Sequence, residues 1–155
     1  MIRRAEEKDL KRINDLLYQV HAVHADKRPD IFVPGIKKYT DEELHALIPD
    51  DTKPIFVWTD DHDETQGYAF CIFEEVKGLP NLQDMKTLYI DDICVEEKMR
   101  RRHIAADLYA FVKEFAAKND CYRVTLNVWE LNPAAMNFYR AMGMRNLKTT
   151  MEEIL

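Results

Sequence analysis

Apolar residues recur at helical spacing in two long stretches of the chain, one near the N-terminus and one after residue 103. The first stripe consists of Leu10, Ile13, Leu16, Leu17, Val20 and His24. The second stripe consists of Ile104, Leu108, Phe111, Val112 and Phe115. A single apolar stripe is typical of a helix that packs one face on a core, so both stretches are predicted to be amphipathic helices.

Runs with β-branched and aromatic members lie before and after these helices and predict strands. The predicted strands are residues 2–4, 54–58, 67–73, 88–95, 122–128 and 145–154. The acidic residues 60–64 form a turn between the second and third strands, which predicts a hairpin. Residues 74–86 are polar and contain Gly78 and Pro80, so we expect a loop there.

Two shorter helices are predicted from their end signals. Thr40 and Glu43 have the spacing of a capping box, and Pro49 ends that helix. Asn132 followed by a proline predicts the start of a last helix, which Gly143 ends. Residues 28–35 hold two prolines and a glycine and predict a loop. The element order predicts an α/β fold with one central sheet and about four helices, in a single domain of residues 1–155.

Composition narrows the classes of function. The chain has 155 residues, of which 46% are hydrophobic and 32% charged, and its formal net charge is -6. This balance fits a globular protein and speaks against general attraction to nucleic acid. No apolar run approaches the ~20 residues of a membrane-spanning helix, and the polar N-terminus is unlike a signal peptide. We therefore expect neither a nucleic-acid nor a membrane partner.

The cysteines and histidines give no sign of a metal centre. The three cysteines are Cys71, Cys94 and Cys121, and their wide separation predicts neither a disulfide framework nor a zinc site. A reducing cytoplasm is the simplest compartment for such a chain. His21 and His24 share a helix face, but no third ligand follows at a suitable spacing. We expect no metal.

The helix after residue 103 begins in a run of positive charge made of Lys98, Arg100, Arg101, Arg102 and His103. The partial positive charge of a helix N-terminus favours acidic residues there. A basic start is understandable if an anion, such as a phosphate, binds the free N–H groups. A solvated basic turn is the alternative that the charges alone leave open.

In the last predicted helix, Asn132, Ala135 and Tyr139 lie at positions i, i+3 and i+7 and share one face. Such a face could line a narrow slot with a phenol at its far end. An ordinary packed helix with a partly exposed tyrosine is the alternative.

The two stretches together resemble the GNAT superfamily of N-acetyltransferases. That family carries R/Q-x-x-G-x-G/A at the start of its central helix, which Arg100, His103 and Ala105 match here, except that His103 replaces the usual glycine. A helical residue whose side chain points outward need not block a phosphate, and the imidazole of His103 could even donate a hydrogen bond. The family's later pattern, N-x-x-A-x-x-F-Y-x-x-x-G, is matched by Asn132, Ala135, Phe138, Tyr139 and Gly143. The resemblance implies a mixed, mostly antiparallel sheet.

The resemblance also implies direct transfer of the acetyl group of acetyl-CoA to a primary amine. It assigns the CoA pyrophosphate to the backbone amides of Arg100, Arg101, Arg102, His103, Ile104, Ala105 and Ala106. A backbone N–H near Val95, with Ile93 beside it, polarises the acetyl carbonyl. Asn132 contacts the pantetheine arm, with Phe138 in the same cofactor site. Tyr139 serves the departing thiolate as a proton donor or hydrogen-bond partner.

A base helps such a transfer, because a free alkylamine is mostly protonated near pH 7. Asp91 and Asp92 lie on the strand that leads to the acetyl site. Adjacent strand residues face opposite sides, so only one of the two should reach the site. In a regular strand Asp91 shares its face with Ile93 and Val95, whereas a bulge would change that parity. We expect Asp91 to be catalytic and Asp92 to contact the substrate; the alternative is two acids at a polar strand end.

In the family that the chain resembles, acceptor specificity depends on the segment that corresponds to the loop after the first helix and the short helix that follows. The resemblance therefore implies that Asp30, Phe32 and Tyr39 contact the substrate. The expected acceptor is a small amine, a polyamine or an amino acid. A protein or peptide amine, a catalytically degenerate CoA-binding regulatory domain and a plain interaction domain are the alternatives. The sequence leaves a homodimer open.

Overall fold

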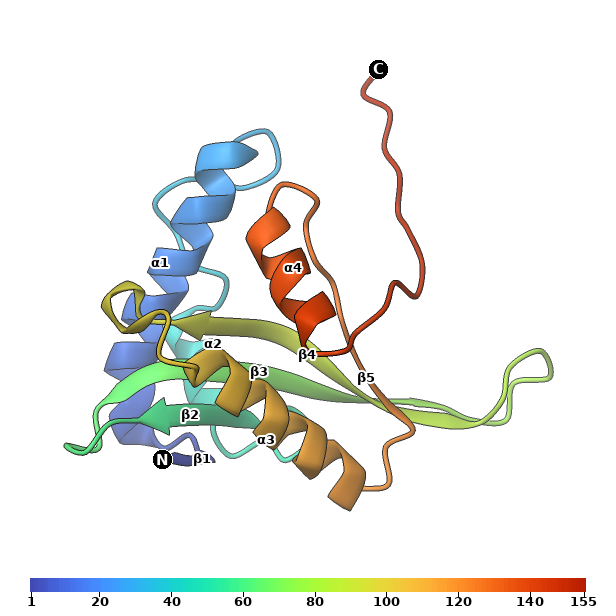
Figure 1. Ribbon diagram of the computed structural model, residues 1–155, viewed down its shortest axis with the longest axis horizontal. Helices are drawn as coiled ribbons and strands as arrows, with labels where there is room; N and C mark the ends of the chain where they lie inside the picture. The colour runs from blue at the N-terminus through green and yellow to red at the C-terminus, as the bar shows by residue number, and fades with distance from the viewer.

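A computed structural model describes every residue from Met1 to Leu155 and contains one five-stranded sheet in the order β1-β2-β3-β4-β5 (Figure 1). The strands are β1 (Ile2–Arg4), β2 (Ile55–Thr59), β3 (Thr65–Val76), β4 (Met85–Val95) and β5 (Arg123–Leu126). The first four strands pair antiparallel, and β5 pairs parallel to β4. The predicted α/β class and the mixed, mostly antiparallel sheet are confirmed.

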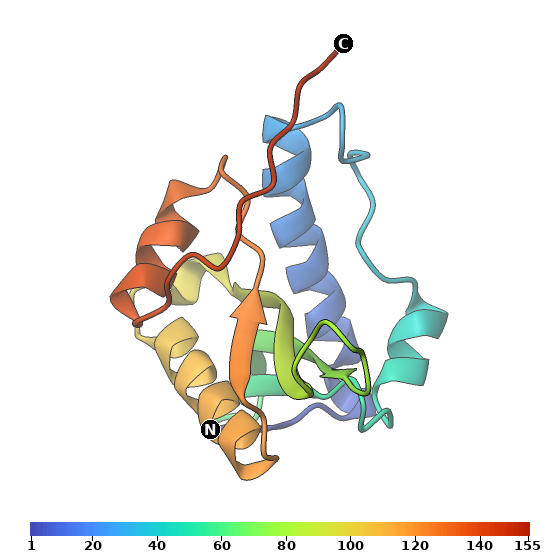
Figure 2. The same cartoon turned by 90° about the vertical axis from the view of Figure 1, so that its right-hand side faces the viewer.

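Four helices cover the two faces of the sheet (Figure 2). They are α1 (Leu10–Lys27), α2 (Asp41–Leu47), α3 (Ile104–Lys118) and α4 (Pro133–Ala141), with short 3-10 turns η1 (Glu7–Asp9) and η2 (Glu97–Met99). α1 and α2 pack on one core with Tyr68, Phe70 and Cys94, whereas α3 packs on a second core with Leu88 and Ile90. Both predicted apolar stripes face these cores.

Hydrogen bonds confirm the predicted caps at the helix ends. The hydroxyl of Thr40 accepts from the Glu43 backbone N–H at 3.2 Å, and the Glu43 carboxylate accepts from the Thr40 N–H at 2.8 Å. The side chain of Asn132 accepts from the Ala135 N–H at 3.2 Å at the start of α4. Gly143 follows α4 with a φ of 93°, a left-handed conformation that glycine adopts without strain.

Three predicted segments differ from the structure. Residues 74–86 are only partly a loop, because β3 and β4 continue to pair as far as Val76 and Met85 and form a ribbon that projects from the body (Figure 1). The predicted strand 122–128 shortens to β5. The predicted strand 145–154 is wrong: these residues form no strand and lead away from the sheet. An alternating pattern can form a strand only where a neighbouring strand accepts its hydrogen bonds.

Candidate active site

A β-bulge in β4 brings two neighbouring acids to the same face of the sheet. Phe70 of β3 lies opposite Asp92, but the next residue, Cys71, lies opposite Ile90, so Asp91 is the extra residue of β4. A bulge breaks the alternation of side chains along a strand. The carboxylates of Asp91 and Asp92 therefore both reach hydroxyl groups of tyrosines on the α1 and α2 side of the sheet.

The alternation expected for a regular strand therefore does not hold, and the bulged alternative applies. Asp91 does not share its face with Ile93 and Val95, whose side chains belong to the core on the α3 side. Both acids, and not only one of them, lie on the face of the sheet that α1 and α2 cover. The cause is the register between β3 and β4, which the sequence of β4 alone does not contain.

The carboxylate of Asp91 is fully engaged by groups of the chain itself. Lys38 Nζ lies 2.7 Å from its Oδ1, and the hydroxyl of Tyr39 donates to its Oδ2. The side chain of Asp91 is only 11% exposed, whereas that of Lys38 is 46% exposed. Burial, followed by the hydrogen bond to Asp91, raises the pKa of Tyr39. Asp91 therefore serves as an anchor for the loop that carries these two residues.

The carboxylate of Asp92 is held less completely. The hydroxyl of Tyr68 donates to its Oδ2 at 2.6 Å, and no side-chain hydrogen bond to its Oδ1 is present. Burial raises the pKa of Asp92 from 3.8 to about 6, against the opposing effects of the Tyr68 hydrogen bond and the charge of Lys38. A carboxyl group with a pKa this close to neutral can both accept and release a proton.

The tyrosines beside the two acids form one aromatic stack. Tyr39 lies parallel to Phe70 with ring centroids 5.3 Å apart, and Tyr68 meets Phe70 edge-on at 4.9 Å. A small pocket of about 60 Å³ adjoins this stack, and its walls are Tyr39, Leu47, Lys53, Phe70, Cys71, Ile72 and Asp91. The stack fixes both hydroxyl groups, so the two carboxylates are held in defined positions.

At the C-terminal end of β4, just beyond the two acids, a tight turn leads into α3. Arg101 and His103 in this turn have φ values of 65° and 63°, and α3 begins one residue later, at Ile104. These left-handed conformations are strained in residues that carry a Cβ. They explain why glycine is usual at the position of His103: the turn requires a positive φ. His103 is thus not a helical residue but the left-handed residue that directly precedes α3.

The first backbone N–H groups of α3 have no partner within the chain. Ile104, Ala105 and Ala106 donate no hydrogen bond, and the side chain of His103 does not cap the helix. The side chains of Arg100, Arg101, Arg102 and His103 that surround them are exposed. Unpaired amides at the end of a 15-residue helix, surrounded by cations, fit a phosphate-bearing ligand.

Close packing of β3 against the same turn depends on Gly67. A Cβ at this position would lie 3.1 Å from the backbone oxygen of Cys94 and 3.3 Å from Cγ2 of Ile104. β4 also lacks a β5 neighbour beyond Ile90, because the parallel pairing ends there with Leu126. Residues 91–95 therefore have no neighbouring strand on the side of β4 opposite β3.

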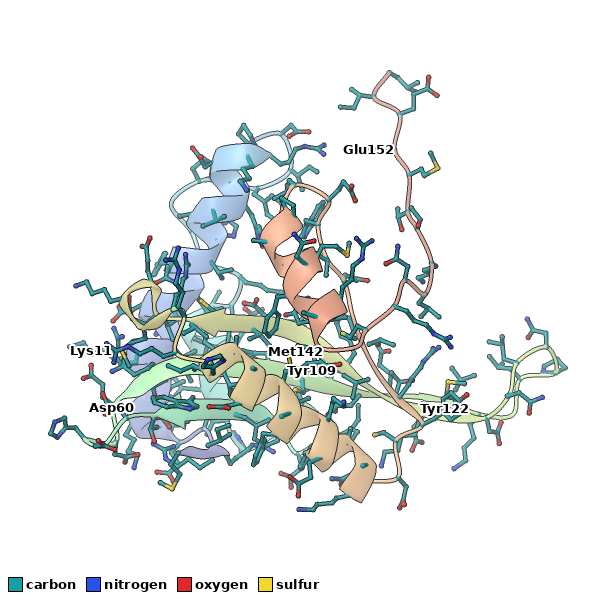
Figure 3. All side chains as sticks on the ribbon, viewed as in Figure 1. Lys11, Asp60, Tyr109, Tyr122, Met142 and Glu152 are labelled. Carbon is teal, nitrogen blue, oxygen red and sulfur yellow. The ribbon has the colours of Figure 1, made fainter.

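The helix α4 brings Tyr139 toward this part of the sheet. α4 packs beside α3, where Tyr109 and Met142 lie close together (Figure 3). The ring of Tyr139 meets the ring of Tyr109 at 6.1 Å and the ring of Phe138 at 5.0 Å. Burial raises the pKa of Tyr139, with a smaller contribution from the charge of Asp92. Its hydroxyl makes no hydrogen bond within the chain and is not among the fully buried polar atoms, so it can serve an incoming ligand.

The loop between α1 and α2 reaches across to the segment between β5 and α4. Phe32 packs against Trp129 with ring centroids 5.1 Å apart, and against His24 at the same separation. Lys27 Nζ donates to the backbone oxygen of Leu131 at 2.9 Å. Asp30 lies apart from this contact, because Arg28 binds both of its carboxylate oxygens. Of the predicted acceptor contacts, Tyr39 joins Asp91 and Phe32 joins Trp129, while Asp30 joins neither.

Sequence reasoning missed several residues of the site. Lys38 and Tyr68 hold the two acids, and the Gln19 side chain donates to the backbone oxygen of Val95 at 3.0 Å. No local motif marks these residues, because each acts on a partner more than twenty positions away. Trp129 carried one available signal, a large aromatic side chain three residues before the predicted cap of the last helix.

Cys94 and His21, for which the sequence predicts no metal site, both have ordinary structural surroundings. Burial raises the pKa of Cys94 to about 12, so its thiol stays protonated near neutral pH and packs as a small apolar group. His21 Nε2 contacts the backbone oxygen of Val33 at 2.7 Å, and no cluster of three or more His, Cys, Asp or Glu side chains occurs in the structure. None of the helices is long and apolar enough to cross a bilayer.

Comparison with known proteins agrees with this geometry. The model of the acetyltransferase (GNAT) family matches residues 17–144. The tetramutant of the BH1408 protein from Bacillus halodurans is 28% identical, the match covers 100% of this chain and 99% of that one, and the TM-score is 0.96. Aminoglycoside N-acetyltransferase AAC(6')-Iy, solved with CoA, is 15% identical over 100% and 98% of the two chains, with a TM-score of 0.73.

A third similar structure is the aminoglycoside acetyltransferase meta-AAC0020 from an uncultured soil metagenomic sample, solved with sisomicin. It is 17% identical over 100% of this chain and 95% of that one, with a TM-score of 0.73. At such identity the two aminoglycoside enzymes share the fold alone. The sheet, the bulged β4 and the unpaired N–H groups at the start of α3 fit an enzyme that transfers a group from a phosphate-bearing donor. The chain belongs to the GNAT family and is an acetyl-CoA-dependent N-acetyltransferase.

Proposed function

We propose that the acceptor is the primary amine of a small molecule and that Asp92, rather than Asp91, accepts its proton. The observation that carries this proposal is the unequal engagement of the two acids. Lys38 and Tyr39 occupy both oxygens of Asp91, whereas Asp92 keeps one oxygen without a side-chain partner. This reverses the roles that the sequence predicted for the pair.

The chemistry of the transfer fits groups on both sides of β4. A C–N bond forms at the acetyl carbon while its C–S bond breaks. The ammonium loses one proton before the attack and the new amide nitrogen loses a second, while the sulfur gains one, so one proton passes to solvent overall. Asp92, with its pKa raised to about 6 by burial, is ionised above that pH and can take the proton of the ammonium. Tyr139 keeps its proton near neutral pH, because burial raises its pKa, and can donate it to the sulfur.

The bound donor would be held at the start of α3. The free N–H groups of Ile104, Ala105 and Ala106 suit the pyrophosphate of CoA, and the exposed Arg100 and Arg102 add positive charge beside them. Acetyl-CoA supplies the activated acetyl thioester. The side chain of Asn132 caps α4 through its oxygen, so its amide N–H₂ group remains available for the pantetheine arm.

The charges near Asp91 favour an acceptor with one ammonium group. Lys38 already neutralises Asp91, so a single carboxylate, that of Asp92, is left to attract a cation. Polyamines and aminoglycosides carry several cations and gain less from such a site. The two similar aminoglycoside enzymes support an amine acceptor in general and not an aminoglycoside here.

A panel of acceptors with acetyl-CoA, followed by release of free thiol, tests the proposal. We expect turnover with small monoamines to exceed that with polyamines, aminoglycosides, amino acids and peptides with a free N-terminus. If a peptide is turned over faster than the small amines, the acceptor is a protein amine and not a small molecule. If CoA binds, as seen by calorimetry, but no amine raises thiol release above hydrolysis, the chain is a binding domain without this activity.

A further inference from the structure

The backbone at the end of β4 has hydrogen-bond partners although it has no neighbouring strand on one side. The pairing of β5 with β4 ends at Ile90, so the rest of β4 lacks a strand on the side opposite β3. Backbone N–H and C=O groups that are shielded from water need partners. At Val95 and Glu97 the partner is a side chain from another element, that of Gln19 in α1, which passes the end of β4 (Figure 1).

The single amide group of Gln19 makes two hydrogen bonds to this backbone. Its Nε2 donates to the carbonyl oxygen of Val95 at 3.0 Å, and its Oε1 accepts from the N–H of Glu97 at 3.2 Å. A residue of a neighbouring parallel strand would bond to the same kind of pair, the C=O of one residue and the N–H two positions further on. The side chain of Gln19 therefore takes the place of a peptide group of such a strand.

The pairing of β3 with β4 sets the direction of the Val95 N–H group. Gly67 lies opposite Val95, and the N–H of the next residue, Glu96, donates to the oxygen of Gln66 at 2.8 Å. Hydrogen-bonded and non-hydrogen-bonded pairs alternate along an antiparallel ladder. The N–H and the C=O of Val95 therefore both point away from β3. Gln19 binds the C=O, while the N–H on the same side stays available to a ligand.

The two peptide groups that flank the Cα of Val95 are both held. The group after the Cα is bound at its C=O end by Gln19 and at its N–H end by the oxygen of Gln66. The group before the Cα contains the Val95 N–H and the carbonyl of Cys94, which faces β3. With both groups fixed, the Val95 N–H has one defined direction. Without Gln19, the group after the Cα would be held at its N–H end alone.

We propose that Gln19 is a positioning residue for the acetyl group, because it holds the Val95 N–H in the direction in which this group polarises the acetyl carbonyl. The proposal rests on the assignment of the Val95 N–H to that carbonyl, which the family resemblance implies. A hydrogen-bond donor of an oxyanion-type site is effective when it is oriented before the reaction begins. Gln19 provides this orientation from α1, a helix outside the groups assigned to CoA.

Arg12 offers a matched comparison within the same helix. Its guanidinium binds the carboxylate of Glu96 at 2.9 Å and the backbone oxygen of Thr65 at 3.2 Å. Arg12 thus also attaches α1 to the segment after β4, but through a side chain and not through the peptide groups of residues 95–97. Its removal should lower stability without turning the Val95 N–H.

Infrared spectroscopy of bound acetyl-CoA, labelled with carbon-13 at the thioester carbonyl, measures the polarisation and needs no acceptor. At saturating donor the labelled band should move to higher frequency in Gln19→Met, which has no amide, and stay in place in Arg12→Met. Gln19→Glu keeps an acceptor for the Glu97 N–H but no donor for the Val95 C=O, so it should move the band as Gln19→Met does. Because it retains one of the two bonds, Gln19→Glu keeps the test decisive if Gln19→Met does not fold.

Steady-state kinetics with the preferred amine of the acceptor panel gives a second measurement. In Gln19→Met kcat should fall by roughly 10-fold, less than the roughly 10²-fold for complete removal of an oxyanion donor, because the N–H remains but is no longer fixed. The calorimetric affinity for acetyl-CoA should stay within about threefold of wild type, since the phosphate contacts are untouched. Arg12→Met should unfold at lower urea concentration and keep its kcat.

The proposal is overturned if the band stays in place in both Gln19 variants or if Arg12→Met moves it equally. It is also overturned if removal of the Gln19 amide tightens the binding of acetyl-CoA, which would mean that the donor itself uses the Val95 C=O. If no amine raises thiol release, the proposed function fails, and the infrared band still decides the role of Gln19.

Discussion

Replacement of Asp92 by asparagine should raise stability and lower activity at the same time. Burial lifts the pKa of this carboxyl group from 3.8 to about 6 in the folded chain. At about 1.4 kcal/mol for each pKa unit, this difference corresponds to a destabilisation of up to about 3 kcal/mol when the group is ionised. Asp92→Asn removes the charge but keeps the shape of the side chain, and its amide oxygen still accepts the hydrogen bond from the Tyr68 hydroxyl.

The sign of this effect depends on pH in a defined way. The folded state binds the Asp92 proton more tightly than the unfolded state, so the folded state loses stability as the pH rises from about 3.8 to about 6. Below this window the wild-type side chain is neutral, and Asp92→Asn should then be nearly as stable as the wild type. Above pH 7 the variant should be more stable by up to about 3 kcal/mol. Urea unfolding at pH 3 and pH 7.5 measures both differences.

The activity of the same variant should change in the opposite direction. Without the carboxylate, kcat/KM for a cationic amine should fall by roughly 10², within the usual contribution of a general base. A higher pH should restore part of the loss by supplying free amine. Asp91→Asn is the matched control: it breaks the contact with Lys38, so it should lose stability at pH 7.5. The reasoning is refuted if Asp92→Asn is no more stable than wild type at pH 7.5, or if its effect on stability is the same at both pH values.

Three further predictions concern groups around the same strand. Tyr139→Phe keeps the ring packing, so turnover should fall by roughly 10² in steady-state assays while the calorimetric affinity for CoA stays near that of wild type; unchanged turnover returns Tyr139 to a packing role. His103→Gly removes a left-handed residue and should stabilise the fold by about 1 kcal/mol in urea unfolding, whereas His103→Ala keeps the Cβ and should not; equal effects would deny the strain. Lys38→Met removes the cation that pairs with Asp91, so the ratio of KM for a diamine to KM for a monoamine should fall. The acid limb of the kcat/KM profile should also move to higher pH, because Lys38 lowers the pKa of Asp92. An unchanged KM ratio would show that Asp91 does not meet the acceptor.

Features set by neighbouring residues could be predicted from the sequence. The stripes of α1 and α3 depend on residues three and four positions apart, and the caps at Thr40 and Asn132 involve a partner three residues away. The paired motifs around Arg100 and Tyr139 then pointed to the family, which the family match confirms. Such interactions are nearly independent of the rest of the chain, so local patterns contain them.

The face of each aspartate and the fate of the last predicted strand depended on distant parts of the chain. The bulge at Asp91 arises from the register of β4 against Phe70 and Cys71, some twenty residues away, and Lys38 reaches Asp91 only because the loop after α1 folds back onto the sheet. The tail has a strand pattern but no strand, because backbone hydrogen bonds need a partner. The sequence by itself determined which residue types are available for the site and at what spacing along the chain. The tertiary structure decided which of them come into contact, because the pairing between strands is set by their register and not by any one strand.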